Sequence, residues 1–418
     1  MSKLTPKIFL TAFVRGLSAL GATSLTYVLA GQLSASEFSE FFGWLSWALV
    51  LSLILRFGGD KIVIKNILNH DEAGFKNVVN SQGLIAVIAI FVTLAWYLSI
   101  ELSSNNLGFV FDPELVMFSL LMVVAYYIAA IFIGVGSTAV ACLVQVGFVQ
   151  FIAAVIIVGN PYANFTADGS KILILLIYLG VMTLVCRKAY QSIKQCEWKE
   201  ISKISPIFAD AASIWKSRVR FFVVGIGANF QAIGMYAIVV LFLSDADFLT
   251  FRYFERIAAF ASIVVVFQGV ILPTFIFRGE GTQFSKVVLR KLAISITISG
   301  CFAVLIGLGL LVCKVLFTDV FTVSISTNLF VLLILTHCVI SISAPLSFVL
   351  TLSEFEQLVF KIQTCYIIFA MISMYTSYLY GGLELMIASL LLIQILRLFM
   401  LISIPIYANR KLRLVTND

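Results

Sequence analysis

Long apolar runs alternate with short polar segments along nearly the whole chain. Runs such as 82–100 and 384–396 are apolar almost throughout, which is typical of membrane helices and differs from the alternating pattern of a membrane β-barrel strand. About 20 apolar residues cross a hydrocarbon core as a helix. The pattern therefore predicts twelve spans, at 8–31, 38–57, 82–100, 115–135, 138–159, 171–186, 221–243, 253–276, 292–313, 327–351, 360–380 and 384–407.

The composition rules out a water-soluble protein. Of the 418 residues, 61% are hydrophobic and 12% are charged, whereas soluble domains average about 25% charged residues. The excess apolar surface must face lipid. The seven cysteines form no CxxC pair, so we expect no metal site, no disulfide framework and no cofactor.

Basic residues are distributed unequally between the two sets of connections. Of the 28 lysines and arginines, 21 fall on one side of the predicted spans and only three on the other. Cytoplasmic loops carry the excess of lysine and arginine in membrane proteins. We therefore expect both termini in the cytoplasm. We interpret the net charge of +7 as an orientation signal rather than as a nucleic-acid site.

Two short segments that lie 210 residues apart have similar sequences. Residues 33–41 read LSASEFSEF and residues 243–251 read LSDADFLTF. Because six spans return the chain to the same side of the membrane, the two halves would be parallel repeats related by an axis along the membrane normal. This predicts an all-α membrane protein with two six-helix lobes, 1–187 and 221–418, and a cleft between them.

A cytoplasmic linker at 188–220 would join the two lobes. It contains a partly amphipathic segment through Trp215, which we expect to form an interfacial helix. Its Lys216, Arg218 and Arg220 would lie near anionic lipid headgroups, which attract basic residues at the cytoplasmic surface. The same residues also contribute to the orientation signal.

Charged groups inside a span are costly and by default indicate a functional site. Arg15 lies inside the first span. Arg252, Glu255 and Arg256 share one helix face because of their i, i+3, i+4 spacing. Arg397 lies about 20 Å from the outer end of the last span and about 15 Å from its inner end. Guanidinium groups match phosphate oxygens, so these arginines predict an anion site in the cleft.

Other polar groups could join this site. Gln394 precedes Arg397 on the same helix face, and Gln145 and Asn229 lie on other spans. Glu255 and His337 are candidates for coupling transport to H⁺ or Na⁺. The alternatives stay open, because a single amide in a span more often forms an interhelical hydrogen bond.

Several stretches resemble a known family. Residues 27–30, 33–38, 57–60 and 243–248, the last followed by a span ending at Pro273, are similar to polysaccharide-unit flippases of the O-antigen type. These belong to the multidrug/oligosaccharidyl-lipid/polysaccharide exporter superfamily. The resemblance implies a V-shaped cleft between two lobes and transport of undecaprenyl-pyrophosphate-linked oligosaccharides across the bacterial inner membrane by alternating access. It also implies association with the polysaccharide polymerase machinery.

Two other functions are open. A drug or cation exporter of the same superfamily would need carboxylates within the membrane, whereas the deeper charges here are mostly arginines. A membrane enzyme of the same pathway, such as a polymerase or ligase, would need a sizeable outer loop or a histidine–carboxylate pair at a surface. The outer connections are short and only two histidines are present, so we expect a transporter rather than an enzyme.

Overall fold

The computed structural model describes residues 4–83, 113–160, 165–194, 218–223, 243–264, 285–316 and 326–415, and the single positions 85, 87, 90, 215, 272 and 276. Every regular element within these ranges is a helix. The predicted spans at 82–100 and 221–243, and the second half of the span at 253–276, lie largely outside the described residues.

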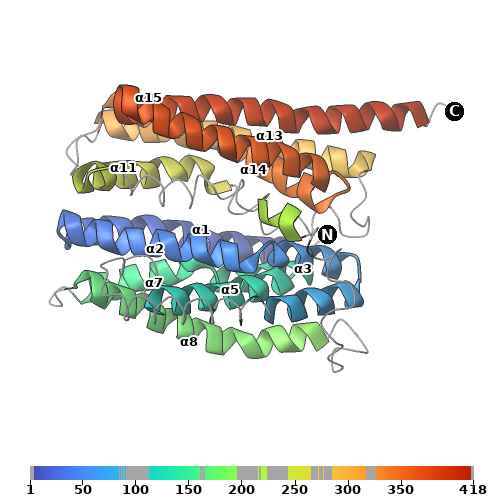
Figure 1. Ribbon diagram of the computed structural model, residues 1–418, viewed down its shortest axis with the longest axis horizontal. Coiled ribbons are helices and arrows are strands. Elements are labelled where there is room, and N and C mark those ends of the chain that lie inside the picture. Colours follow the sequence, from blue (N-terminus) through green and yellow to red (C-terminus); the bar gives the residue numbers. More distant parts are fainter. Residues whose placement is uncertain are drawn as a thin grey trace, which may run out of the picture.

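The N-terminal half of the chain forms one lobe, whose helices run side by side (Figure 1). The span predicted at 138–159 is divided into two helices, with Val144 and Gln145 at the break. The helices of this lobe are α1 (Leu4–Ala30), α2 (Ala35–Arg56), α3 (Gly59–Leu68), α5 (Pro113–Gly134), α6 (Thr138–Leu143), α7 (Val146–Gly159) and α8 (Ala167–Lys194).

The second lobe contains α11 (Asp245–Ala258), the short 3₁₀ helix η2 (Ala259–Ser262), α13 (Lys286–Leu316), α14 (Thr327–Leu352) and α15 (Glu356–Val415). The backbone of α15 is not helical at Gly381 and Gly382, and Gly382 has a φ of 66°, a conformation that glycine adopts without strain. The chain reverses there, so the two halves of α15 form a hairpin (Figure 1). This confirms the predicted boundary between the last two spans.

The chain is a multi-pass membrane protein. Within the described ranges, seven helices are long and apolar enough to cross a membrane: α1, α2, α5, α8, α13, α14 and α15. The apolar part of α15 has 51 residues, which suffices for two crossings. The chain enters α1 and leaves α15 at the same end of the bundle, here called the terminal end (Figure 1), as an even number of spans requires. The total of twelve stays a prediction.

The two similar sequence segments begin equivalent helices. Helix α2 begins at Ala35 and α11 begins at Asp245, 210 residues later. Both helices bury an aromatic pair with i, i+3 spacing, Phe38 with Phe41 and Phe248 with Phe251. In α2 the hydroxyl of Ser34 accepts the backbone N–H of Glu37 as part of a capping box. The matching residues therefore have matching structural roles, while superposition of the whole halves stays a prediction.

Helices α1 and α7 approach each other closely because glycines face each other at their contact. A methyl group at Gly21 would overlap the carbonyl oxygen of Gly147, and one at Gly147 would overlap that of Ser18. Small residues allow such close packing between membrane helices, where van der Waals contact drives association.

This contact predicts that Gly147→Ala lowers the thermal stability of the purified protein, by the equivalent of about 1–3 kcal/mol for overpacking. The matched control is Gly159→Ala on the same helix, where an added methyl group meets no atom within 4 Å. Alanine there is expected to be neutral or to stabilise the helix by up to about 1 kcal/mol. Equal unfolding temperatures for the two variants would contradict the close packing.

The end of the linker lies inside the N-terminal lobe rather than at a lipid surface. Arg218 is fully buried and donates hydrogen bonds to the carbonyl oxygens of Arg56 and Val78 and to the side chain of Gln82. The expectation that Arg218 lies near lipid headgroups is therefore wrong. A guanidinium group can satisfy several unpaired carbonyl groups at once, and this anchoring is tertiary and cannot be read from local charge.

At the terminal end, an ion cluster joins the two lobes and the linker. Glu356, the first residue of α15, accepts from Lys65 of α3 at 2.8 Å and from Arg220 at 3.1 Å. We call these three residues the terminal latch. Beside it, the ammonium group of Lys61 lies 4.5 Å from the ring centroid of Phe348 on α14. Arg220, which we expected near lipid headgroups, pairs with Glu356, and Lys216 lies outside the described residues.

Candidate functional site

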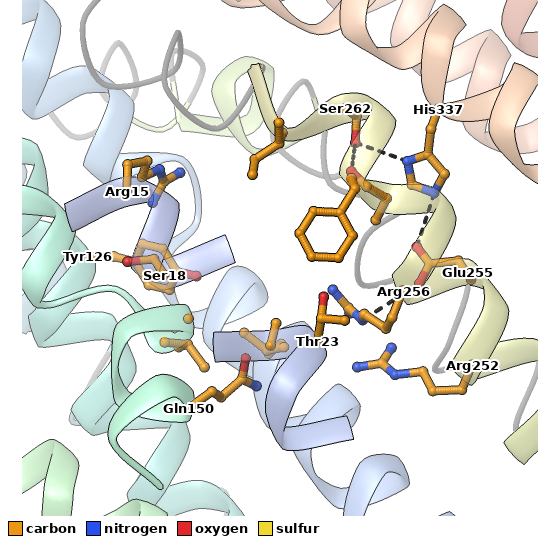
Figure 2. A pocket seen from close by; sticks show the side chains of 17 residues that line it. Arg15, Ser18, Thr23, Tyr126, Gln150, Arg252, Glu255, Arg256, Ser262 and His337 are labelled. Carbon is orange, nitrogen blue, oxygen red and sulfur yellow. Dashed lines mark hydrogen bonds and ion pairs between the residues drawn. The ribbon is translucent and has the colours of Figure 1, made fainter. Parts of the chain in front are cut away.

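A cavity of about 290 Å³ lies between the two lobes. One wall comes from α1, α2, α5 and α7, and the other from α11, η2 and α14. Figure 2 shows the polar side chains that face each other across it. Farther along α1, away from the terminal latch, the ring of Tyr27 lies 6.3 Å from that of Tyr253 on α11. The cavity therefore lies between two contacts that join the lobes.

Arginines line both walls of this cavity. Arg15 projects from α1, while Arg252 and Arg256 extend from α11 towards α1 (Figure 2). Helix α11 begins earlier than the predicted span, at Asp245, so Arg252 lies within the helix and is only 2% exposed. Its guanidinium carbon lies 5.2 Å from the ring centroid of Phe42 on α2. Arg15 and the two arginines of α11, which lie far apart in the sequence, thus line one cavity.

One carboxylate moderates this positive charge. Glu255 is 2% exposed, with Oε2 lying 3.6 Å from Nε of Arg256 and Oε1 lying 3.3 Å from Nε2 of His337. The spacing on α11 predicted the shared face of Glu255 and Arg256, but not their proximity to His337 on α14. With His337 neutral, the described lining residues carry three positive charges and one negative charge. The cavity is therefore suited to an anion.

His337 contacts a hydroxyl group and a carboxylate through its two ring nitrogens. The hydroxyl of Ser262 lies 2.9 Å from the carbonyl oxygen of Ala259 and 3.0 Å from Nδ1 of His337, and the donor in the second contact depends on the tautomer of the imidazole ring. Nε2 of His337 faces Glu255. The cavity wall thus contains two adjacent side chains of types that exchange protons.

The sequence did not indicate this pair. We expected no histidine–carboxylate pair at a surface, and a buried pair does not contradict that expectation. The structure brings His337 and Glu255 together inside the cavity, where both side chains are at least nine-tenths buried, rather than at a surface.

Several uncharged lining residues were not predicted. Ser18 and Ala22 follow Arg15 at i+3 and i+7 on α1 and face the same cavity, and this spacing was a usable signal. Tyr126 on α5 also lines it, and its position in the sequence carries no comparable signal. Gln150 on α7, which was a candidate alongside Gln145 on the same predicted span, lines the cavity as well.

The other predicted site residues lie elsewhere. Gln145 precedes α7 at the break after α6 and is not among the described lining residues. Asn229 lies outside the described residues. Gln394 and Arg397 lie in the second half of α15, buried in the hairpin and facing Tyr366 of the first half. Contact between these residues and a substrate stays a prediction.

No known protein-family model matches the chain, and no curated protein matches its sequence. Solved structures resemble it over nearly its whole length. A mutant of the Vibrio cholerae MATE transporter VcmN has a TM-score of 0.62 and 14% identity, with 98% of each chain covered. The MATE multidrug transporter DinF-BH has a TM-score of 0.65 and 14% identity, with 97% of this chain and 95% of that chain covered.

A third structure, the outward-facing conformation of a multidrug resistance MATE family transporter of the MOP superfamily, has a TM-score of 0.62 and 12% identity. The match covers 94% of this chain and 93% of that chain. At such low identity, these likenesses establish the fold alone. The chain has the MATE fold, which agrees with the superfamily that its sequence resembles but does not distinguish among the substrates of that superfamily.

Proposed function

We propose that the chain is a flippase that moves undecaprenyl-pyrophosphate-linked oligosaccharide units across the bacterial inner membrane by alternating access. The observation that carries this proposal is the placement of arginines on both walls of the inter-lobe cavity. A pyrophosphate group loses much hydration free energy when it leaves water, and uncompensated burial of its charge would be prohibitive. Guanidinium groups from both walls compensate that charge through short charge-assisted hydrogen bonds.

Because the arginines are divided between the two lobes, the substrate can also be released when the lobes move apart. When the lobes lie together, Arg15 and the α11 arginines can contact the same phosphate groups. Motion of one lobe relative to the other moves Arg15 away from Arg252 and Arg256, so the anion keeps fewer donors. A ligand shifts a conformational equilibrium only through its differential affinity for the two states. The pyrophosphate would therefore favour the closed arrangement and leave from the open one.

The alternative function is export of organic cations, because the structures of similar fold include multidrug transporters. The carboxylate of the described lining, Glu255, already contacts Arg256 and His337. A cationic drug would enter a cavity with excess positive charge, which is unfavourable at low dielectric. An enzymatic role for the Glu255–His337 pair has less support, since the chain has the fold of transporters.

The test is a reconstituted transport assay in proteoliposomes. We expect the purified protein to move a fluorescent undecaprenyl-pyrophosphate oligosaccharide from one leaflet to the other, measured as protection from a membrane-impermeant quencher. A cationic dye such as ethidium should not be transported. Transport of the dye without movement of the lipid-linked sugar would overturn the flippase proposal and support the drug exporter.

We further propose that transport is coupled to H⁺ rather than Na⁺ through Glu255 and His337. Both side chains lie in the cavity wall, so binding of an anionic substrate and gain or loss of a proton by the pair would affect each other electrostatically. Bound Na⁺ would need several oxygen ligands near Glu255, whereas its charged neighbours on α11, Arg252 and Arg256, repel cations. Arg15 on α1 adds to this repulsion across the cavity.

Alternating access requires the terminal latch to open in each cycle. We therefore predict that cross-linking the lobes there stops transport. Cysteines at Lys65 and Glu356, in a background without the native cysteines, would be joined by a short reducible bifunctional thiosulfonate. Transport should fall to the level of empty liposomes and return after reduction. Each single cysteine variant, treated in the same way, is the control, and undiminished transport by the cross-linked protein would contradict the rocking of the lobes.

A further inference from the structure

Tyr126 of α5 lines the inter-lobe cavity together with Arg15 and Ser18 of α1. These side chains belong to the wall of the N-terminal lobe, opposite the arginines of α11 (Figure 2). Tyr126 lies within electrostatic range of the charge of Arg15. A phenol group has one O–H donor, which can bind a phosphate oxygen without adding charge. This wall therefore offers an anion a neutral donor as well as a cationic one.

The ring of Tyr126 stacks on the guanidinium group of Arg56, the last residue of α2. The guanidinium carbon lies 3.7 Å from the ring centroid, which is the geometry of a cation–π contact. Arg56 is 4% exposed and is not itself among the described lining residues. It therefore acts on the described cavity wall through a residue that lines it.

Arg56 is held in place from several directions. Its Nε donates to the carbonyl oxygen of Ser52 at 3.2 Å, and its Nη1 donates to Oδ2 of Asp60 at 3.1 Å. Its own carbonyl oxygen accepts from Nη1 of Arg218 at 3.3 Å. A guanidinium plane that is fixed in this way also fixes the orientation of the ring that stacks on it. A side chain that is already ordered loses less entropy when a ligand binds.

We propose that Tyr126 contacts the transported anion, with its hydroxyl donating to a phosphate oxygen, and that Arg56 is the residue that positions it. The cation against the ring favours negative charge on the phenol oxygen, which strengthens the O–H group as a donor. Asp60 balances the charge of Arg56, so Arg56 acts on the anion mainly through the ring. The inference rests on the anion site of the proposed function, but on neither the lipid nor the sugar.

Inorganic pyrophosphate is the probe, and calorimetry measures its dissociation constant for the purified full-length protein. Tyr126→Phe removes the hydroxyl but keeps the ring, and should weaken binding about tenfold, as expected for one hydrogen bond to a charged group. Arg56→Gln, combined with Asp60→Asn so that no unpaired carboxylate remains, should weaken binding by a similar factor or less. Arg290→Gln, which removes an exposed arginine on α13, should bind as the wild type does.

The two changes should be non-additive. In the Tyr126→Phe background, the change at Arg56 and Asp60 should alter the dissociation constant by less than about twofold, because no hydroxyl is left to position. Equal weakening in both backgrounds would show a merely structural role and overturn the proposal. Wild-type affinity in Tyr126→Phe, or no saturable binding by the wild-type protein, would also overturn it. Arg56→Lys, which keeps the charge beside Asp60, supplies the same cycle if the double change unfolds the protein.

The transport assay separates this inference from the flippase proposal. Non-additive pyrophosphate binding without movement of the lipid-linked sugar would refute the flippase and retain the positioning of Tyr126. Movement of the lipid-linked sugar with additive binding effects would refute the positioning of Tyr126 alone.

Discussion

Arg252→Ala is expected to lower the rate of lipid-linked sugar transport by about 10- to 100-fold in proteoliposomes. A hydrogen bond to a charged group is worth about 1.5–3 kcal/mol, and each 1.4 kcal/mol corresponds to a factor of ten. Arg252 is buried in the cavity wall, where few water molecules can replace its guanidinium group. The loss should therefore lie at the upper end of this range.

Two further variants separate charge from geometry. Arg252→Lys keeps the charge but loses the planar fork of donors, so it should recover only part of the rate. Arg290→Ala removes an exposed arginine on α13 and should transport at the wild-type rate. All variants are compared at equal amounts of reconstituted protein. If Arg252→Ala transports at the wild-type rate, Arg252 is not part of the anion site. That result would not decide whether the protein is a flippase.

Glu255→Gln is expected to abolish the proton flux that accompanies transport. The glutamine side chain has nearly the same size as glutamate and can still hydrogen-bond to His337, but it cannot exchange a proton. The substitution also removes the negative charge beside Arg256, so an anionic substrate should bind more tightly and KM should fall. A pH-sensitive dye inside the liposomes measures the proton flux, and quencher protection measures the movement of lipid.

The two readouts distinguish coupling from simple damage to the cavity. A damaged cavity would lose both fluxes and raise KM, whereas an uncoupled transporter still moves substrate down its gradient. Ser262→Ala is the matched control, because it removes a hydrogen-bond partner of His337 but leaves both titratable groups in place. It should retain proton flux. Wild-type proton flux in Glu255→Gln would show that the coupling group lies elsewhere.

Helical membrane architecture, the positions of most described spans and the shared charged face of α11 were all predictable from the sequence. These features depend on local properties, because apolar length determines a span and 3.6 residues per turn determine which residues share a face. The spacing of Arg252, Glu255 and Arg256 therefore predicted their common face before any tertiary contact was known. The similar segments at 33–41 and 243–251 likewise predicted two equivalent helix starts.

Contacts between distant segments were decided only by the tertiary structure. The sequence could not place Arg15 opposite α11, bring His337 to Glu255 or bury Arg218 in the N-terminal lobe. Nor could it place Arg397 beside Tyr366 in the α15 hairpin, and contact of Arg397 with a substrate stays a prediction. The physical reason is that depth along a span can be calculated from residue number, but the direction of a side chain relative to other helices depends on packing. A buried arginine has the same local sequence pattern whether it faces a cavity, a carbonyl cluster or a neighbouring helix.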